Sequence, residues 1–373
     1  MPAQDKEPVR YAVVGLGYIS QVAVLPAFAH ATENSRLTAL VSDDPVKRRR
    51  LGRKYGARNL YSYDDYEDCL RSGQIDAVYI ALPNTMHCDY TVQAAEAGVH
   101  VLCEKPMATS SDECHQMIDA AGANDVRLMI AYRLHFEGAN LSAVELAQSG
   151  KLGRLRFFNS VFSMSVKEGN IRLDRELGGG TLWDIGIYCI NAARYLFRSE
   201  PYEVFAYSAR GEDPRFREVD EMTSAFLRFP GERLATFTSS FGASDISMYH
   251  LVGTKGDLRL DPAYEFADSL RQELSIAGKK KTQTYRRRDQ FAPELIYFSD
   301  CVRKATSPEP SGEEGLADVR IIEALYESAR SGQPIELEPF QRRQRPTRDQ
   351  EIKRRPVRKP ELVHAERPSQ GGD

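Results

Sequence analysis

Short apolar runs alternate with longer amphipathic stretches over the first 130 or so residues of the chain. Each apolar run has the length of a buried strand, and each stretch between two runs has the length of a helix. Strands that alternate with helices in this way pair in parallel and form a doubly wound sheet. The sequence therefore predicts an α/β domain over residues 1–132. The expected strands lie within residues 11–17, 36–44, 76–83, 100–106 and 126–133.

The pattern changes after about residue 135. Residues 154–166 alternate apolar and polar side chains, and three further strand-like stretches follow residue 200, joined by short turns. Alternation with tight connections is typical of an antiparallel sheet. Helices are expected at 140–153 and 181–197, and an amphipathic helix at 312–333 closes this part. We therefore expect a second, α+β domain over residues 133–338.

The last stretch, residues 339–373, has few apolar residues. From Gln341 to Asp373 it holds ten Lys/Arg, five Asp/Glu and four prolines. Such a segment cannot bury enough surface to fold alone, so we expect a basic, proline-rich tail that is extended or disordered. A nucleic-acid-binding arm is a weaker alternative, because basic runs are usually only solvated.

The composition limits the class of protein. A chain of 373 residues with 42% hydrophobic and 28% charged residues fits a two-domain soluble protein. We see neither a membrane-spanning run of roughly 20 apolar residues nor a signal peptide, and we expect a cytoplasmic protein. The six cysteines form no CxxC pair and no pattern with histidine. Reduced thiols, without metal or disulfides, are therefore expected.

A glycine turn follows the first strand. The segment "GLGYIS" has two of the three glycines of the dinucleotide fingerprint, with Ser20 in the third place. Gly15 permits the tight turn, and Gly17 lets the backbone approach a pyrophosphate. Because the turn joins a strand to a helix, we predict a Rossmann domain that binds a dinucleotide. The expected contacts are Gly15, Leu16, Gly17, Tyr18 and Ile19.

The end of the second strand indicates which dinucleotide is bound. An NAD site usually has an acidic residue here, on the ribose hydroxyl. In this chain the first polar residue is Ser42, and Lys47 is followed by three arginines. A hydroxyl with cations suits the 2′-phosphate of NADP, so we expect NADP. NAD stays the less favoured alternative, because Asp43 could reach the ribose.

Two further segments carry candidate chemistry. The strand that ends in Glu104 is followed by Lys105, at the strand edge where doubly wound sheets bind ligands. In "GGGTLWDIGIY", Asp184 and Tyr188 lie one helical turn apart and share a face. We expect the three glycines, residues 178–180, to leave room for cofactor or substrate. The alternative is packing, with Tyr188 as a core tyrosine.

Five segments together resemble one family across nearly the whole folded length. They are "VVGLGYIS", "ALPNTMH", "CEKPMA", "NIRLDRELGGGTLWDIGIY" and "GEEGLADVRIIEALYESARSG". The chain resembles the glucose–fructose oxidoreductase / inositol dehydrogenase / MocA-like family, with the closest likeness to the glucose–fructose oxidoreductase branch. The resemblance implies a C-terminal domain with a large open, mostly antiparallel sheet that pairs subunits as a homodimer or a dimer of dimers. It also implies that Lys105, Asp184 and Tyr188 line the substrate pocket.

Sugar oxidation needs a hydride acceptor and a base for the hydroxyl proton. A free tyrosine, with a pKa of about 10, is a poor base near neutrality, but a nearby ammonium lowers that pKa. We therefore expect Tyr188 as the acid/base group, tuned by Lys105 and supported by Asp184. The expected activity is NADP-dependent oxidation of an aldose to a lactone, with coupled reduction of a second sugar as a variant. Alternatives are a polyol or trans-dihydrodiol dehydrogenase and a non-enzymatic dinucleotide-sensing regulator.

The remaining expected cofactor contacts follow strand ends or precede the glycine loop. Arg133 follows a strand, and Arg172 lies before the glycines, within reach of nicotinamide or substrate. His87 is explained equally well as a capping or packing residue. The full set is Leu82, Pro83, Asn84, His87, Glu104, Lys105, Arg133 and Arg172.

Overall fold

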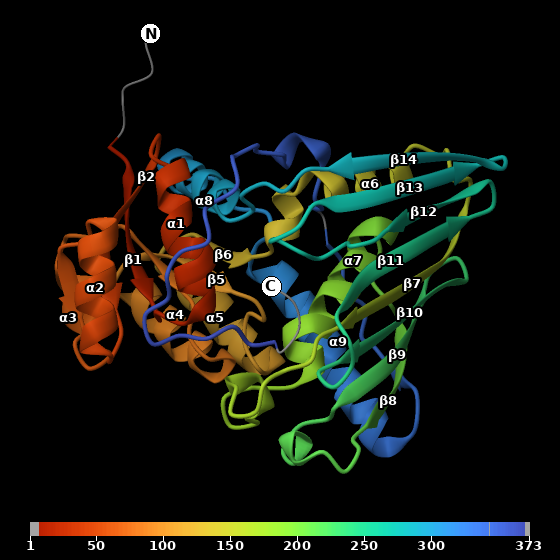
Figure 1. Ribbon diagram of the computed structural model, residues 1–373, viewed down its shortest axis with the longest axis horizontal. Coiled ribbons are helices and arrows are strands. Elements are labelled where there is room, and N and C mark those ends of the chain that lie inside the picture. Colours follow the sequence, from red (N-terminus) through yellow and green to blue (C-terminus); the bar gives the residue numbers. More distant parts are fainter. Residues whose placement is uncertain (1–6, 343, 370–373) are drawn as a thin grey trace, which may run out of the picture.

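Two β-sheets organise the chain, and helices lie between and around them (Figure 1). The computed structural model describes residues 7–342 and 344–369. Residues 1–6 of the first expected domain, and residues 343 and 370–373 of the expected tail, lie outside the described residues.

The first sheet is parallel and has six strands in the order β3-β2-β1-β4-β5-β6. This is the strand order of a Rossmann fold, as the alternating pattern predicted. Its strands are β1 (Val9–Val14), β2 (Ser35–Val41), β3 (Asn59–Tyr61), β4 (Ala77–Ile80), β5 (His100–Glu104) and β6 (Leu128–Ala131). Around them lie the π-helical turn η1 (Ser20–Val24), α1 (Leu25–Ala27), η2 (Phe28–His30), α2 (Pro45–Tyr55), α3 (Tyr66–Arg71), η3 (Asn84–Met86), α4 (His87–Glu96) and α5 (Ser111–Ala123).

The second sheet has nine strands in the order β14-β13-β12-β11-β7-β10-β9-β8-β15. Within the described residues, β7 and β10 are its one parallel pair, so the sheet is mostly antiparallel, as expected. Its strands are β7 (Leu155–Ser163), β8 (Glu203–Ala209), β9 (Met222–Phe229), β10 (Arg233–Ser240), β11 (Ile246–Gly253), β12 (Gly256–Leu260), β13 (Leu270–Ile276), β14 (Lys279–Tyr285) and β15 (Ile335–Glu336).

Helices fill the space between the two sheets (Figure 1). One of them, α9, packs against α5 on one side and β8 on the other, so it joins the two halves. The helical elements after β6 are η4 (Arg133–Phe136), α6 (Gly138–Gln148), η5 (Ile171–Leu173), the π-helical turn η6 (Leu182–Gly186), α7 (Ile187–Phe197), η7 (Pro214–Phe216), α8 (Ala292–Lys304), α9 (Gly312–Ser331) and η8 (Arg348–Gln350).

One helix returns to the first sheet, which the sequence pattern did not predict. Helix α8 packs against β1 and β2. The hydroxyl groups of Tyr11 and Ser299 are 2.7 Å apart, and the Asn34 amide donates to the Ile296 carbonyl at 2.9 Å. Residues 133–338 therefore contribute α8 to the layer around the first sheet, where α9 also packs against β6.

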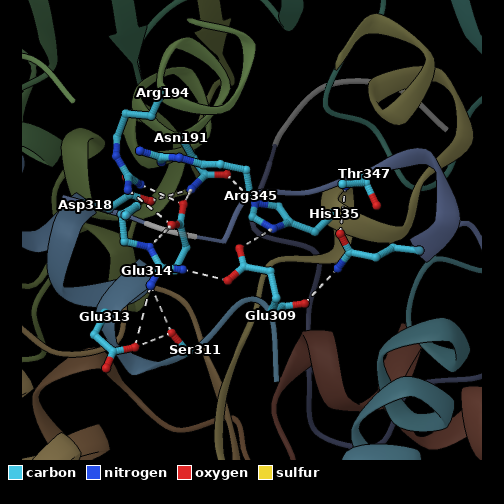
Figure 2. Close-up of polar contacts among 12 residues, drawn as sticks. His135, Asn191, Arg194, Glu309, Ser311, Glu313, Glu314, Asp318, Arg345 and Thr347 are labelled. Carbon is cyan, nitrogen blue, oxygen red and sulfur yellow. Dashed lines mark hydrogen bonds and ion pairs between the residues drawn. The ribbon is translucent and has the colours of Figure 1, made fainter. Parts of the chain in front are cut away.

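The described part of the tail follows an extended path over both halves and contains one short 3₁₀ turn, η8. It is held near its start by a buried ionic cluster around Arg194 (Figure 2). In this cluster Arg342 pairs with Glu309 at 2.6 Å and with Glu314 at 2.9 Å, and Arg345 pairs with Glu200 at 2.6 Å. The tail is thus held by contacts with the other elements, because a segment with so few apolar residues cannot fold alone.

Candidate active site

Lys105, Asp184 and Tyr188 meet at the edge of the parallel sheet that faces the second half of the chain. Lys105 directly follows β5, Asp184 lies in η6 and Tyr188 lies in α7. The Lys105 Nζ donates to the Asp184 carbonyl at 2.7 Å and to its Oδ1 at 3.3 Å. The same Nζ lies 4.8 Å from the centre of the Tyr188 ring. The structure therefore brings the three predicted groups together.

The segment that carries Asp184 is not the regular α-helix that its spacing predicted. Leu182–Gly186 form a π-helical turn, and α7 begins only at Ile187. Such wide turns are frequent at functional sites. Both Asp184 and Tyr188 still face Lys105, and the Asp184 backbone carbonyl is one of the ammonium's two acceptors. The four-residue spacing gave no signal of this turn, because an α-helix also places such residues on one face.

Two cations fix the charge of Asp184. The Arg172 Nε donates to its Oδ2 at 2.5 Å, and Lys105 holds its Oδ1. Burial alone would raise the pKa of Asp184, but Arg172 and Lys105 outweigh it and lower this pKa to about 2. Burial also acts to lower the pKa of Lys105, whereas Tyr188 and Asp184 raise it, and the net pKa is raised. Asp184 is therefore a carboxylate, and Lys105 an ammonium, around neutral pH.

The Tyr188 ring is held by its neighbours. The Arg133 guanidinium lies 4.9 Å from the ring centre, and the rings of Phe162 and Tyr264 lie at 5.6 and 5.9 Å. Arg133 is itself fixed by the Gln290 side chain and the Tyr264 carbonyl. No hydrogen bond to the Tyr188 hydroxyl is formed by any residue in the ranges 7–342 and 344–369. The contacts therefore orient the ring without engaging its hydroxyl group.

The glycine loop before η6 does not leave open space, so that expectation is wrong. A Cβ on Gly179 would lie 2.4 Å from the Arg172 carbonyl oxygen, and one on Gly178 would lie 2.7 Å from the Asn84 Cβ. The Asn84 amide also donates to the Gly178 carbonyl at 2.8 Å. Protein atoms fill the space beside these glycines because the loop packs tightly between Arg172 and the segment after β4. The glycines thereby join the two halves next to the site.

The glycine turn after β1 has the geometry of a dinucleotide site. Gly15 has a φ of 91°, and a Cβ there would lie 2.4 Å from the Ala81 carbonyl oxygen, so only glycine fits. A Cβ on Gly17 would meet nothing within 4 Å, so the backbone is open to a ligand there. Ser20 donates to the Gly15 carbonyl at 2.6 Å and closes the turn. Of the other predicted contacts, Leu16 is buried, and Tyr18 and Ile19 are half-buried.

Asp43, which follows β2, has one of its two carboxylate oxygens in a hydrogen bond with the protein backbone. Its Oδ1 accepts the Tyr63 backbone N–H at 2.8 Å, within the loop after β3. Ser42 is buried, and its carbonyl accepts from the Arg48 guanidinium. Lys47 lies in the first turn of α2, half-buried beside them. Cations therefore lie close to the Ser42 end of the strand, while one oxygen of the nearest acidic side chain is turned to the backbone.

His87 is placed differently from the prediction that it contacts the cofactor. It is fully buried, with its ring nitrogens 2.8 Å from the Pro106 carbonyl and 3.0 Å from the Leu82 carbonyl. No ring nitrogen remains for a ligand, so His87 joins the segments that follow β4 and β5. Glu104 accepts from the Tyr79 hydroxyl at 2.8 Å, and burial raises its pKa. Leu82 is buried as well, while Pro83 is half-buried beside Asn84.

Some neighbours of the site carried no signal in the sequence. Tyr264 and Gln290, which hold Arg133, come from irregular segments more than 120 residues away along the chain. Phe266 lies 5.5 Å from the same guanidinium. No local motif marks these residues, because they meet Arg133 only through contacts between segments that lie far apart along the chain.

Several features bear on other classes of protein. In the described ranges, no group of three or more His, Cys, Asp and Glu residues could hold a metal ion. None of the helices described is long and apolar enough to span a membrane. The six cysteines are buried and unpaired.

Comparisons with known proteins match both halves of the chain. The model of the oxidoreductase family with an NAD-binding Rossmann fold matches residues 9–132, and that of the GFO/IDH/MocA C-terminal domain matches residues 141–259. The chain is 33% identical over 339 residues to D-xylose 1-dehydrogenase [NADP(+)] of Haloarcula marismortui, covering 89% of this chain and 94% of that one.

Solved structures give the same result. The aldose-aldose oxidoreductase from Caulobacter crescentus, complexed with glycerol, superposes with a TM-score of 0.85 at 36% identity, over 89% of this chain and 100% of that one. A 3-ketoreductase from Actinomadura kijaniata in complex with NADP and TDP-benzene shares the fold, with a TM-score of 0.80 at 24% identity over 86% and 98% of the two chains.

Proposed function

The chain belongs to the GFO/IDH/MocA oxidoreductase family, and from that premise we propose that it is an NADP-dependent sugar oxidoreductase. Hydride would pass between the nicotinamide and the hydroxyl-bearing carbon of an aldose, giving a lactone in the oxidative direction. The similarity to an NADP(+) xylose dehydrogenase at 33% identity and to an aldose-aldose oxidoreductase at 36% supports this substrate class and this cofactor. Coupled reduction of a second sugar by the same bound cofactor is the finer form of the proposal.

The observation that carries the proposal is the convergence of Lys105, Asp184 and Tyr188. They lie at the carboxyl edge of the parallel sheet, where ligands of such sheets bind. In our proposal Tyr188 is the acid/base residue, Lys105 is the cation beside its ring, and Asp184 holds Lys105 in place.

The glycine turn and the residues after β2 fit the cofactor. Open backbone at Gly17 suits a diphosphate, and the basic start of α2 at Lys47 suits a 2′-phosphate. NADP bound there supplies the hydride acceptor. The side chains around Tyr188 then have to orient the sugar, exclude water and accept one proton.

The proton transfer is assigned to the Tyr188 oxygen. As the carbon–hydrogen bond of the sugar breaks, the hydroxyl proton passes to the phenolate oxygen and the carbonyl forms. Lys105, with its Nζ 4.8 Å from the ring centre, puts a positive charge beside the ring that takes up this proton. In the reverse direction the phenol returns the proton. General acid–base catalysis of this kind contributes about 10²–10⁴-fold to the rate.

The proposal is tested with a panel of aldoses, cyclic polyols and a trans-dihydrodiol, each with NADP and with NAD. We expect turnover with aldoses and NADP. Activity confined to polyols or the dihydrodiol would contradict the sugar assignment. Replacing Ser42 and Lys47 with alanine should raise KM for NADP more than KM for NAD, and equal effects would contradict the NADP assignment.

We also propose that the protein forms a homodimer through the outer face of the second sheet. Cross-strand neighbours put a row of exposed apolar side chains on this face, including Phe157 paired with Leu234. Phe226 is 52% exposed and Tyr207 is 63% exposed on the same face. The described helices beside this sheet lie on its other side, toward the parallel sheet (Figure 1). Apolar surface of this extent is typical of an interface.

A cytoplasmic location belongs to the same proposal, because it suits six free cysteines.

A further inference from the structure

The last described stretch of the tail, residues 361–369, crosses from the parallel sheet's half of the molecule to the second half beside the glycine turn. In Figure 1 the tail runs down past α1 and then crosses toward the second half of the molecule. We propose that these residues, which we call the strap, are part of the cofactor site. The strap covers the 2′-phosphate and diphosphate half of bound NADP and slows its release. This inference rests on the proposed NADP site.

The strap is attached to the glycine turn through one side chain. Gln21 is buried, and its Nε2 donates to the Leu16 carbonyl at 3.0 Å and to the Val363 carbonyl at 2.9 Å. Its Oε1 accepts the Val363 N–H at 2.8 Å. Val363 is itself buried. The backbone of the strap is therefore bonded to the same amide that holds the phosphate-binding turn.

A second attachment lies where the 2′-phosphate is expected. The His364 Nδ1 is 2.7 Å from the Asp44 Oδ2. Asp44 caps α2 by accepting the N–H groups of Val46 and Lys47 at 2.8 and 3.0 Å. The strap thus lies against the short segment that begins with Ser42. Glu361, at the start of the strap, is 3.3 Å from Arg50 of the same helix.

The far end of the strap is attached to the second half of the chain. The Lys167 N–H donates to the Pro368 carbonyl at 2.8 Å, and Val166 forms an antiparallel bridge with Ser369. Pro368 and Ser369 are buried. Between the two attachments, the charge of Arg367 acts on Tyr18 of the glycine turn and lowers the pKa of that phenol, although burial, the larger effect, raises it.

The strap is thus anchored beside the glycine turn at Gln21 and Asp44 and in the second half at Val166 and Lys167. In our proposal the segment between these anchors, with the Arg367 cation, crosses over the cofactor. A diphosphate at the glycine turn lies beneath this crossing and next to the positive charge of Arg367, which attracts it. The cofactor leaves only when contacts at one end of the strap open. Opening of such covering segments often limits the rate of ligand release. Slow release favours an enzyme that reoxidises its cofactor in place with a second sugar.

Release of NADPH tests the strap directly. The NADPH dissociation rate constant is measured by stopped-flow fluorescence with excess NADP as displacing ligand. We expect a rise of about tenfold or more in a chain that ends at Pro360, and a smaller rise in Arg367→Ala. The matched control is Arg358→Ala. Arg358 is an exposed arginine of the same tail, without a hydrogen bond, ion pair or ring contact to any other described residue. The dissociation rate constant of this variant should equal that of the unchanged protein.

A second measurement, made on the full chain, tests the proposal if the truncated chain does not fold. In the full chain, amide hydrogen exchange across 361–369 should slow when NADPH saturates the site. Equal release rates in all chains, or exchange unchanged by NADPH, would overturn the strap proposal while leaving the proposed function intact. A full chain that binds no NADPH overturns the NADP assignment and the strap together. Faster release after truncation or in Arg367→Ala, with Arg358→Ala unchanged, supports the strap.

Discussion

Asp184 forms ion pairs with two cations of the candidate site, Lys105 and Arg172. Its low pKa and the raised pKa of Lys105 keep both groups charged over a wide range of pH. A carboxylate with a lowered pKa stabilises the fold above its unfolded value of 3.8 and loses this effect as the pH falls through about 2. An ammonium with a raised pKa stabilises the fold below 10.5 and loses the effect above it. The ionic contacts are therefore constant from about pH 4 to pH 10.

The first prediction concerns Asp184→Asn. The amide cannot neutralise Lys105 and Arg172, so we expect kcat/KM for the sugar to fall about a hundredfold. The stability difference between wild type and variant should not change between pH 5 and pH 9, because both partners stay charged over this range. Urea unfolding at several pH values checks this part. A stability difference that disappears within that range would contradict the charge states.

His135 gives a second prediction. Its ring is fully buried, with Nε2 2.8 Å from the Asn191 Oδ1 and Nδ1 3.8 Å from Glu309 (Figure 2). Burial lowers the pKa of His135 from 6.5 to about 4. The unfolded chain therefore gains a proton below pH 6.5 that the folded chain takes up only near pH 4, so this group destabilises the fold as the pH falls. Burial raises the pKa of Glu309 to about 7, which acts in the opposite direction.

The variant His135→Gln removes only the histidine contribution. Relative to this variant, wild type should lose about 2 kcal/mol of unfolding free energy between pH 7 and pH 5. Urea denaturation of both proteins at the two pH values measures the difference. The same pH dependence in both proteins would show that the His135 pKa is not lowered.

At the scale of single residues, the sequence indicated the chemical groups better than their surroundings. Lys105, Asp184 and Tyr188 could be chosen because each follows a strand end or shares a helix face. The role of His87 could not be predicted, because its partners are backbone carbonyls on two separate segments. The space beside Gly179 depends on how the loop packs, which no local pattern encodes.

At the scale of elements, the glycine loop makes a direct prediction. Ala at Gly179 would put its Cβ 2.4 Å from a backbone oxygen that cannot move aside without shifting η5. We expect Gly179→Ala to destabilise the fold by about 1–3 kcal/mol and to raise KM for the sugar. Gly122→Ala is the control, because a Cβ at that position of α5 meets nothing within 4 Å. This control should be neutral or stabilising by up to about 1 kcal/mol, and an equal loss in both variants would contradict the packing argument.

The order of strands and helices followed from the sequence, whereas their irregularities did not. Strand–helix alternation predicted the parallel sheet, in which Asp44 caps the helix that starts at Pro45. The π-helical turn at Leu182–Gly186 leaves the spacing of polar residues unchanged. Helix α8 was missed because its apolar face is buried by β1 and β2, almost 300 residues earlier in the chain.

At the scale of the whole molecule, the proposed dimer makes a prediction of its own. Phe226→Glu puts a charge in the middle of the exposed apolar face of the second sheet. We expect this variant to be monomeric in sedimentation analysis and wild type to be dimeric. Leu60→Glu is the matched control, since Leu60 is 38% exposed but lies on β3 of the other sheet. A dimer that survives Phe226→Glu, or a monomeric wild type, would contradict this interface.

The family, the fold class and the mostly antiparallel second sheet were all predictable. Several motifs pointed to one family, and the strand–helix alternation of the first part and the apolar–polar alternation of the second agreed with its fold. The domain boundaries at residues 132 and 338 stay a proposal. Helix α8 lies within the second expected domain along the sequence but packs against β1 and β2 of the first. The path of the tail could not be predicted, because its composition indicates only that it cannot fold alone. Its position over the glycine turn depends on isolated contacts, such as that of Val363 with Gln21.

The central claim is that Tyr188 transfers the proton while the sugar is oxidised. Its most direct test is the rate at which reduced nicotinamide absorbance appears when enzyme saturated with NADP is mixed with an aldose that the substrate panel finds active. The account predicts that Tyr188→Phe lowers this single-turnover rate by about 10²–10⁴-fold. Tyr207→Phe, an exposed tyrosine on β8, should leave the rate unchanged. A Tyr188→Phe variant that forms reduced nicotinamide at the wild-type rate on every active aldose would contradict the claim.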